Sequence, residues 1–507
     1  MSVPDPARPD RGRAAVGMRA PHGVPALDRP RVQRTGKQQR APRTAGTLRQ
    51  ELSGRQLGMI ALGGAIGTGL FLGSGQGLAL AGPVVVVAYA AAAVLALAVT
   101  FAVAEMASVH PEAGGFGAVA HAYLGPMAGF VQRWTYWGAQ VVNIGSEAVA
   151  AGLYTRFWWP DLPLWVPVAA FSAAMVGVNA LSVRFFGEFE YWFAMVKVCA
   201  IVAFVLIGVA AIVFGLPGQK PIGASTITAH GGLAPNGLTG LWMALCIAAF
   251  SYIGTETLSL TAAEARNPSR DIPRAARATV FRLALFYVLS MCVVVAIVPW
   301  TEASDGDGVA QSPFVRLFGA AGVPAAAAIM NLVVLTAALS AMNTNLFATA
   351  RTLHSLGQVG QAPARFARLS RRGTPLSALL LSTVGALAAV LISAIAPAHV
   401  FPAMISVALF NALITWLLIF ATHLVFHRAR RAAGHAVSPV RLAGAPVTTV
   451  LAMASIVAVL VTMAFTDQFR LAILAGLPCL AATIALYPLV RRKLQSRPEA
   501  SSGSRRL

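Results

Sequence analysis

The sequence predicts an all-α integral membrane protein with twelve transmembrane helices. The first observation is composition: 57% of the 507 residues are hydrophobic and only 11% are charged, against roughly a quarter charged in ordinary soluble domains. The second is a series of apolar runs, each near the ~20 residues that a helix needs to cross ~30 Å of hydrocarbon. The third is that positive charge gathers in alternate connections between these runs, which is how membrane orientation is encoded.

The twelve predicted spans are read from the apolar runs in chain order. Several contain glycine, which membrane helices tolerate when neighbouring helices or a cavity satisfy the backbone. The predicted ranges are about 57–78, 82–107, 127–153, 162–182, 191–215, 238–262, 280–300, 323–348, 376–395, 401–424, 446–465 and 470–490.

The charges of the connections support an even number of spans. With the N-terminus in the cytoplasm, the acidic connection after the seventh span (Glu302, Asp305, Asp307) falls outside, and every strongly basic connection falls inside. The net charge of +21 therefore indicates membrane orientation rather than nucleic-acid binding. Both termini are predicted to be cytoplasmic. The basic connections hold Arg266, Arg270, Arg274 and Arg277, then Arg365, Arg368, Arg371 and Arg372, then Arg428, Arg430 and Arg431, and finally Arg491, Arg492 and Lys493.

The chain divides into one large membrane domain and two tails. Residues 1–50 are polar and rich in Pro and Arg, a composition typical of disorder, and they lack an apolar stretch of the signal-peptide kind. We expect residues 51–490 to form the transmembrane domain and 491–507 a second basic cytoplasmic tail. Whether Met1 or Met18 is the true start stays open. The four cysteines lie inside apolar runs without metal-ligand spacing, so we expect reduced cysteines, no metal and no cofactor.

Two of the predicted spans contain interruptions. The first includes four glycines in the seven residues 63–69, at a cost of about 1 kcal/mol each relative to Ala in a helix. The sixth includes the segment 250–256, where a glycine and small polar residues precede Glu256. The two spans are five apart, so they cross the membrane in opposite directions. Paired interruptions in two inverted halves indicate a transporter's binding site near the membrane midplane.

Backbone electrostatics suggest what such a site binds. A broken helix frees N–H groups at one new end and carbonyl groups at the other. The N–H end suits a carboxylate and the carbonyl end suits an ammonium group. Two adjacent breaks therefore form a receptor for a zwitterion. The alternative is that the glycines of the first span only allow tight helix packing, and the matching interruption in the sixth span favours the binding site.

Several long segments in the same order resemble the amino acid permease family of the amino acid–polyamine–organocation superfamily. The likeness is to the bacterial branch that takes up aromatic, aliphatic and basic amino acids and GABA, and it covers about residues 50–490. The segments that carry it are RQLGMIALGGAIGTGLFLGSG in the first span, AGP at 81–83, AEM at 104–106, FSYIGTE and AAEARNPSRDIPRA between 250 and 275, and MNLVVLTAALSAMNTNLFATAR at 330–351.

The resemblance implies a five-plus-five inverted repeat of the LeuT-like type, with discontinuous helices 1 and 6, two extra helices and uptake driven by protons. It places the substrate carboxylate on the amides of residues 67–69 and the amine on carbonyls near Ala65, Ile66, Phe250 and Ile253. Phe250 stands where related transporters cap the substrate with an aromatic ring. The full set of implied substrate-binding residues is Ala65, Ile66, Gly67, Thr68, Gly69, Phe250, Ser251, Ile253, Gly254, Thr255 and Glu256.

Two ionisable residues are candidates for proton coupling, because charges inside a membrane are costly. Lys197 lies in the fifth span, where the family picture places it between helices 1, 5 and 8 at the position of a coupling cation; alternatively it snorkels to the cytoplasmic interface. Glu256 is expected to hold the coupling proton or to gate the site; alternatively it forms a structural hydrogen bond across the broken helix. Glu147, in the outer part of the third span, is expected to be structural or to line an access path.

The remaining polar residues in the spans are expected to be structural. Glu105 and Glu264 lie near cytoplasmic helix ends and are expected to tie down connections. Asn343 and Asn345 are expected to hold helices together. His423 is expected at the membrane interface.

The function predicted from these features is secondary active transport of an amino acid in the bacterial cytoplasmic (inner) membrane. The expected partners are the amino acid substrate, protons and membrane lipids, but not nucleic acid. The small residues Ser251, Thr255 and Ser340 favour a neutral side chain on the substrate. An exchanger, a GABA or basic amino acid permease and a nutrient sensor remain alternatives. An enzyme is disfavoured because no metal site or nucleophile–base pair is found, and a channel because no filter-like carbonyl loop is found.

Overall fold

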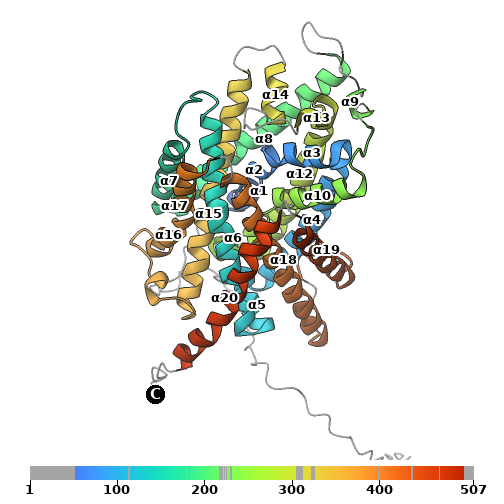
Figure 1. Cartoon of the computed structure of the whole chain (residues 1–507). Helices are drawn as coiled ribbons and strands as arrows, with labels where there is room; N and C mark the ends of the chain where they lie inside the picture. The colour runs from blue at the N-terminus through green and yellow to red at the C-terminus, as the bar shows by residue number, and fades with distance from the viewer. Residues whose placement is uncertain are drawn as a thin grey trace, which may run out of the picture. The chain divides into compact units, whose positions relative to one another are not determined.

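The computed structural model describes residues 52–495, apart from 112–114, 182, 216–220, 222, 224, 229–230, 304–311, 321–325, 398–399, 435–437 and 467–468. The described chain is helical (Figure 1), and its extended backbone pairs only in a parallel bridge between Leu52 and Ala265. The predicted tail at 1–50, which includes Met18, lies outside the described residues, as do Asp305 and Asp307. Of the predicted tail at 491–507, residues 491–495 continue the last helix and residues 496–507 lie outside the described residues.

Helices occupy the first six predicted ranges, and the first and sixth ranges are both divided. They are α1 (Gly54–Ala65), α2 (Thr68–Phe71), α3 (Gly73–Ala81), η1 (Gly82–Val84), α4 (Val85–Val109), α5 (Gly115–Leu124), α6 (Pro126–Thr155), α7 (Trp165–Ala180), α8 (Val183–Val213), α9 (Ser225–Thr228), α10 (Gly237–Ser251), α11 (Thr257–Thr261) and η2 (Ala262–Glu264).

Helices also occupy the last six predicted ranges. They are α12 (Pro268–Ile297), α13 (Trp300–Ala303), α14 (Pro313–Ala320), α15 (Ala326–Gln358), η4 (Ala364–Ala367), α16 (Leu376–Ser382), α17 (Val384–Ile395), α18 (Val400–Ala432), α19 (Val447–Phe465) and α20 (Arg470–Gln495).

Within the described ranges, eight helices are long and apolar enough to cross a membrane. One of them joins α3 to α4, so it does not correspond to a single predicted span. The helices α7 and α10 are apolar but shorter. Together these lengths and compositions support a multi-pass membrane protein, whereas the count of twelve spans stays a prediction.

Local sequence explains where several helices begin. Ser53 caps α1: its side chain accepts from the Gln56 amide, and the Gln56 side chain accepts from the Ser53 amide, which is a capping box. The helix α6 begins at Pro126 directly after Gly125, whose φ is 95°. Proline suits the first helical position because its missing N–H would have no partner there.

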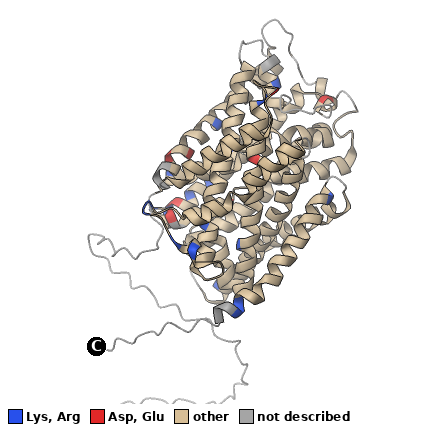
Figure 2. Cartoon of the chain, turned by 60° about the vertical axis from the view of Figure 1, so that its left-hand side comes forward, with Lys and Arg blue, Asp and Glu red and all other residues tan. Residues whose placement is uncertain are grey.

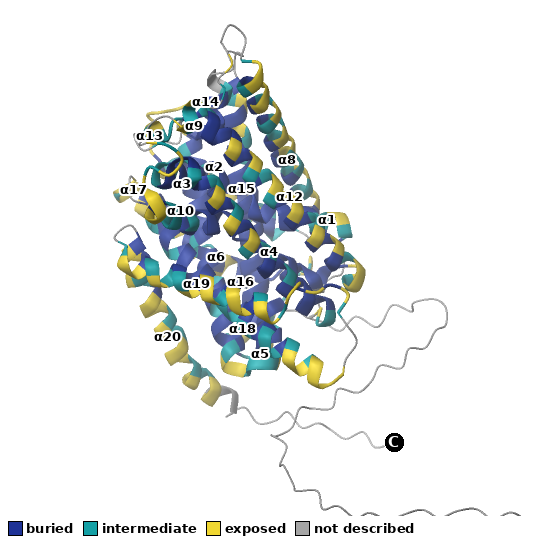
Figure 3. Cartoon of the chain, turned by 90° about the vertical axis from the view of Figure 1, so that its right-hand side faces the viewer, coloured by how far each residue is buried: buried dark blue, intermediate teal, exposed yellow. Residues whose placement is uncertain are grey.

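The helices α6 and α15 lie at the centre of the bundle, and α1 packs beside them. The helix α6 packs against α15 and α18, and α1 contacts α8, α12 and α15. In Figure 3 buried residues fill this central region, while exposed residues mark the outer faces of helices such as α8 and α12. The central position of α1 and α6 brings the polar residues of both helices into the interior.

The outer faces are apolar, as expected for contact with lipid. Leu206 on α8, Phe281 on α12 and Leu474 on α20 are 65%, 70% and 62% exposed, respectively. Figure 2 shows few charged residues along the helices and several Lys and Arg residues toward the lower end of the bundle in that view. Exposed apolar faces this extensive need an apolar partner, and a bilayer supplies one.

Candidate functional site

The first break lies between α1 and α2. The α-helix ends at Ala65, Ile66 and Gly67 have extended backbone, and α2 starts at Thr68. Such a break leaves carbonyls at the end of α1 and N–H groups at the start of α2 without helical partners. All five predicted binding residues of this segment, 65–69, are buried.

The second break lies between α10 and α11. The helix α10 ends at Ser251, residues 252–256 form turns, and α11 starts at Thr257. Gly254 has a φ of +106°, in the region that glycine adopts far more readily than other residues. The predicted binding residues on this segment, from Phe250 to Glu256, are buried as well.

The two breaks touch each other through glycine. A Cβ atom added to Gly254 would lie 2.5 Å from the Gly64 carbonyl oxygen, and one added to Gly69 would lie 2.6 Å from the Cα atom of Ser251. The absence of these side chains therefore allows the backbone of the α1–α2 break to meet the backbone of the α10–α11 break. The glycines thus serve close packing, and the same packing places both sets of free backbone groups in one small region.

Tyr287 on α12 bridges the two breaks, a role that the sequence did not reveal. Its hydroxyl oxygen lies 2.7 Å from the Ala65 carbonyl oxygen and 3.1 Å from the Ser251 carbonyl oxygen. One hydroxyl hydrogen can be donated to only one of these carbonyls at a time. Because Ala65 was predicted to bind the substrate amine, one of the predicted acceptors is already in contact with a protein donor.

Lys197 lies against the carbonyl end of α1. Its side chain is fully buried, and Nζ donates to the carbonyl oxygens of Gly63 and Ile66, each at 2.6 Å. The alternative that Lys197 snorkels to an interface is therefore wrong in this structure. The ammonium group occupies the carbonyl end of the break, where the negative end of the helix dipole stabilises a cation.

Glu147 on α6 lies at the opposite, N–H end of the same break. Its Oε1 atom accepts from the Thr68 amide at 3.4 Å and from the Thr68 hydroxyl at 3.1 Å. Its Oε2 atom is buried and has no hydrogen-bond partner among the described residues. The sequence placed Glu147 outside the site, because nothing in the spacing of α6 shows that this carboxylate reaches α2.

Glu190 on α8 is a buried carboxylate that the sequence analysis did not single out. It precedes Lys197 by seven residues, so both side chains lie on one helix face. It accepts from the Ser340 hydroxyl and, at 3.1 Å, from the Asn343 amide nitrogen. Glu190 and Glu147 both lie within electrostatic reach of Lys197. The signal that could have found Glu190 was an acid and a lysine two helical turns apart in one apolar span.

Glu256 joins the second break to two other helices. Its two carboxylate oxygens accept from the backbone amide of Gly254, two residues earlier, at 3.2 Å (Oε1) and 3.1 Å (Oε2). It also accepts from Gln140 Nε2 on α6 and from Trp416 Nε1 on α18, each at 3.2 Å. The carboxylate is thus surrounded by donors, which is the arrangement expected of the structural alternative. The sequence did not predict the roles of Gln140 and Trp416.

Other polar residues in the helices are structural. Asn343 accepts from Asn179 Nδ2 at 2.7 Å and donates to Glu190, so it holds α15 against α7 and α8, as predicted. The Asn345 amide nitrogen has no partner among the described residues, so this part of the prediction is not supported.

The connections are tied down by acids, as predicted. Glu105 accepts from the Leu442 amide at 3.0 Å, and Glu264 pairs with Arg351 at 2.9 Å. His423 was expected at an interface, but it is fully buried: it contacts Glu105 and the Thr449 hydroxyl, each at 3.1 Å. The cause is the packing of α18 against α4 and α19, which encloses the ring.

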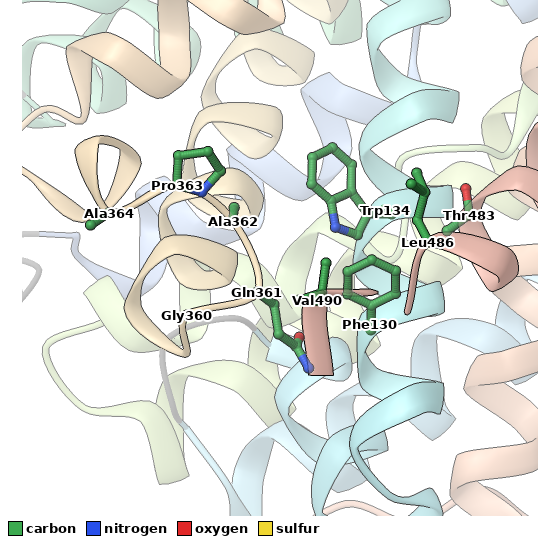
Figure 4. A pocket seen from close by; sticks show the side chains of 10 residues that line it. All are labelled: Phe130, Trp134, Gly360, Gln361, Ala362, Pro363, Ala364, Thr483, Leu486 and Val490. Atoms are coloured by element: carbon green, nitrogen blue, oxygen red, sulfur yellow. The ribbon is translucent and has the colours of Figure 1, made fainter. Parts of the chain in front are cut away.

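A cavity of about 440 Å³ lies away from the two breaks (Figure 4). Phe130 and Trp134 on α6 face the 360–364 segment across it, and residues of α20 form another wall. None of the break residues lines this cavity. At the first break, Glu147, Lys197 and Tyr287 already contact backbone groups, so a substrate would have to replace some of these contacts.

Two adjoining helix breaks within a bundle of apolar helices define a polytopic membrane protein with a polar centre. The sequence profile of the amino acid permeases matches residues 56–492, and the chain therefore belongs to the amino acid permease family. This is a family of permeases rather than enzymes.

Several bacterial transport proteins are similar to this chain. The chain is 36% identical to a probable threonine/serine transporter of Bacillus subtilis, over 87% of this chain and 94% of the relative. It is 36% identical to the gamma-aminobutyric acid permease of the same species, over 83% and 89%. It is 37% identical to the aromatic amino acid transport protein AroP of Escherichia coli K12, over 76% and 84%.

One solved structure supports the fold. The manganese transporter of Eremococcus coleocola superposes with a TM-score of 0.53 at 13% identity, over 87% of this chain and 94% of that one. At this identity the likeness concerns the fold alone.

Proposed function

We propose that this protein is a secondary active transporter that imports neutral amino acids by proton symport, with alternating access to the two sides of the membrane. The observation that carries the proposal is the meeting of two helix breaks in a member of the amino acid permease family. The breaks leave N–H groups and carbonyl groups close together. Backbone groups can therefore bind both the carboxylate and the amine of a zwitterion.

The proposed binding mode uses the backbone of both breaks. The substrate carboxylate binds the amides of Gly67, Thr68 and Gly69, and its amine binds carbonyls of residues 65, 66, 250 and 253. At residues 65 and 66 the amine replaces the donors Tyr287 and Lys197, respectively. In this structure Glu147 lies against the Thr68 amide and hydroxyl, where the substrate carboxylate would bind. Substrate binding therefore requires Glu147 to move aside or to become neutral, since two carboxylates at one helix N-terminus repel each other.

The charge balance around Lys197 supports proton coupling. Two carboxylates, Glu147 and Glu190, lie within electrostatic reach of one ammonium group, so the buried set carries one excess negative charge when all three are ionised. Buried charge without a partner is costly, and a single proton removes the excess. We therefore propose that Lys197 and its two acids hold the coupling proton, with Glu256 retained as a second candidate for coupling or gating.

The substrate is proposed to be a neutral amino acid. The small side chains Ser251, Thr255 and Ser340 favour a substrate side chain of small to medium size. Relatives that are named for threonine and serine, gamma-aminobutyrate and aromatic amino acids agree with a zwitterionic ligand without fixing its side chain. GABA or a basic amino acid is the alternative class.

The proposed topology has twelve spans, a five-plus-five inverted repeat of the LeuT-like type and both termini in the cytoplasm. The helices in each predicted range support it, as does the likeness to a transporter fold. We place the protein in the bacterial cytoplasmic membrane, with residues 51–490 as the transport domain. Cysteine-labelling of the 360–375 and 300–303 connections in intact and opened cells tests the orientation, because the two should lie on opposite sides.

The decisive experiment is uptake by the purified protein in liposomes, using pooled labelled amino acids with and without an inwardly directed proton gradient. We expect accumulation that requires the gradient, and unlabelled competitors then identify the substrate. Equilibration without the gradient would indicate an exchanger or a uniporter and would exclude Lys197 and Glu256 as coupling groups. Arginine or lysine as the best competitor would exclude the neutral substrate class. Binding without uptake would indicate a sensor.

A further inference from the structure

A deep apolar groove runs along the outside of the bundle between α4, α10 and α19, which lie side by side in Figure 1. It encloses about 490 Å³, and apolar residues of all three helices form its walls. Val94 on α4 and Leu451 on α19 border it and are 66% and 61% exposed. The groove contains none of the break residues, so it is separate from the proposed transport site.

The groove has the length of one acyl chain. Its wall on α4 extends from Ala91 to Phe101, and its wall on α19 extends from Thr448 to Val459. These walls cover eleven and twelve helical residues, or about 15–17 Å at 1.5 Å per residue. One leaflet of a bilayer has a hydrocarbon depth of about 15 Å, half of the ~30 Å core, so the groove is about as long as one leaflet is deep.

One end of the groove is basic. Arg441 lines it, and the Arg441 guanidinium lies 3.4 Å from His427 Nε2. Arg431 follows His427 by four residues on α18, one helical turn away, so three basic side chains lie near this end of the groove. Among the described residues, no carboxylate lies within ion-pair distance of Arg441. Glu105, the acid that also acts on His427, already accepts from His423 and the Leu442 amide.

Arg441 is held at this position by its neighbour in the chain. The Leu442 amide donates to the buried Glu105 carboxylate at 3.0 Å, which fixes the segment that enters α19. The guanidinium contacts His427 but faces no carboxylate among the described residues, so its charge can pair with an anionic ligand. A fixed cation at the end of an apolar groove, at the depth of one leaflet, matches a phospholipid headgroup above its acyl chain.

We propose that this groove binds one anionic phospholipid of the cytoplasmic leaflet, with an acyl chain between α4 and α19 and the headgroup phosphate on Arg441. The leaflet follows from the proposed orientation, in which the basic connection after α18 is cytoplasmic. A second copy of the chain fits less well, because a two-fold contact would bring the same basic end and the same concave surface from both partners.

The test measures lipid binding directly and does not depend on transport. The purified full-length protein, stripped of lipid, is titrated in detergent with dioleoyl phosphatidylglycerol or dioleoyl phosphatidylcholine, and bound lipid is counted by native mass spectrometry. We expect one phosphatidylglycerol to bind more tightly than any phosphatidylcholine. Arg441→Gln should weaken it about fivefold, the factor corresponding to about 1 kcal/mol for one arginine near a membrane surface. The matched control is Arg368→Gln, an exposed arginine away from the groove.

A second pair of variants tests the groove itself. Ser455 lines the groove, so Ser455→Trp should fill it and abolish the tight site, whereas Ala454→Trp, which is exposed on the same helix outside the lining set, should not. Equal binding of the two lipids, or unchanged binding in both Arg441→Gln and Ser455→Trp, would overturn the proposal. A dimer that Ser455→Trp abolishes, without a bound lipid, would assign the groove to a second copy instead.

Discussion

The two helix breaks satisfy their free backbone groups in different ways. At the first break, the partners are charged side chains from other helices: Lys197 on the carbonyl end and Glu147 on the N–H end. At the second, Glu256 caps the break from within and is fixed by Gln140 and Trp416. The first break is therefore held by an acid and a lysine from two other helices, whereas the second is held by one acid within the break that has three donors around it. Under the proposed function, we expect protonation and substrate binding to act on the α1–α2 break, while the α10–α11 break keeps its position.

The largest effect is expected from Lys197→Ala. It would leave Glu147 and Glu190 buried without their cation, and removing one partner of a buried charge set costs about 3–5 kcal/mol. We expect a lower melting temperature and uptake that no longer depends on the proton gradient. Thermal unfolding in detergent and uptake across a pH series measure the two effects.

Two companion variants separate structure from coupling at Lys197. Adding Glu190→Gln to Lys197→Ala should recover part of the stability, since one unpaired charge is removed. Lys197→Arg keeps the charge but cannot release its proton. Uptake by this variant should therefore not depend on the proton gradient, even where its melting temperature is normal. Proton dependence that survives in both Lys197 variants would remove this residue from the mechanism.

The same substitution at a glycine of each break should have unequal effects. In Gly254→Ala the new Cβ would lie 2.5 Å from a backbone oxygen, at a φ of +106°, and the left-handed backbone alone costs about 1–2 kcal/mol. In Gly67→Ala the nearest atom is Oε1 of Glu147 at 2.6 Å, the end of a side chain that can turn away. We expect Gly254→Ala to lower folded yield and melting temperature, and Gly67→Ala to keep the fold but weaken substrate binding.

Gly58→Ala serves as the control for both glycine variants, because no atom lies within 4 Å of the added Cβ. Substrate binding is measured by the shift in melting temperature that a saturating substrate causes. If Gly67→Ala also fails to fold, the glycines of the α1–α2 break are needed mainly for packing. The expected difference between the two breaks would then be wrong.

The two breaks also differ from the residues around them in how well the sequence predicts them. Runs of glycine and small polar residues located both breaks, and Lys197 was visible as a lysine inside an apolar span. These features are local in the chain. Glu147, Glu190 and Tyr287 reach the breaks from other helices, and their contacts depend on helix rotation and packing. For the same reason the sequence could not decide whether Lys197 is buried or exposed at an interface.

A smaller effect is expected from Glu256→Gln. The amide keeps the size of the carboxylate, but it brings an N–H donor toward the donors of Gly254 and Trp416. The loss of hydrogen bonds to a charged acceptor corresponds to about 1.5–3 kcal/mol. We expect a lower melting temperature with the proton dependence of uptake intact, since the network is saturated with donors. Loss of proton dependence in a folded Glu256→Gln protein would instead assign Glu256 to coupling and make the two breaks alike.

The smallest effect is expected from Tyr287→Phe, which tests whether the breaks act together. The variant removes one hydroxyl between the carbonyls of Ala65 and Ser251 and keeps the ring, so the net cost should be about 1 kcal/mol. A double-mutant cycle with Lys197→Ala reveals coupling, because Tyr287 and Lys197 bind carbonyls of the same helix end. Non-additive changes in stability would indicate that the α10–α11 break responds to the charge at the α1–α2 break. Additive stabilities, with normal substrate affinity in Tyr287→Phe, would mean that this hydroxyl does not connect the two breaks and that each break responds separately.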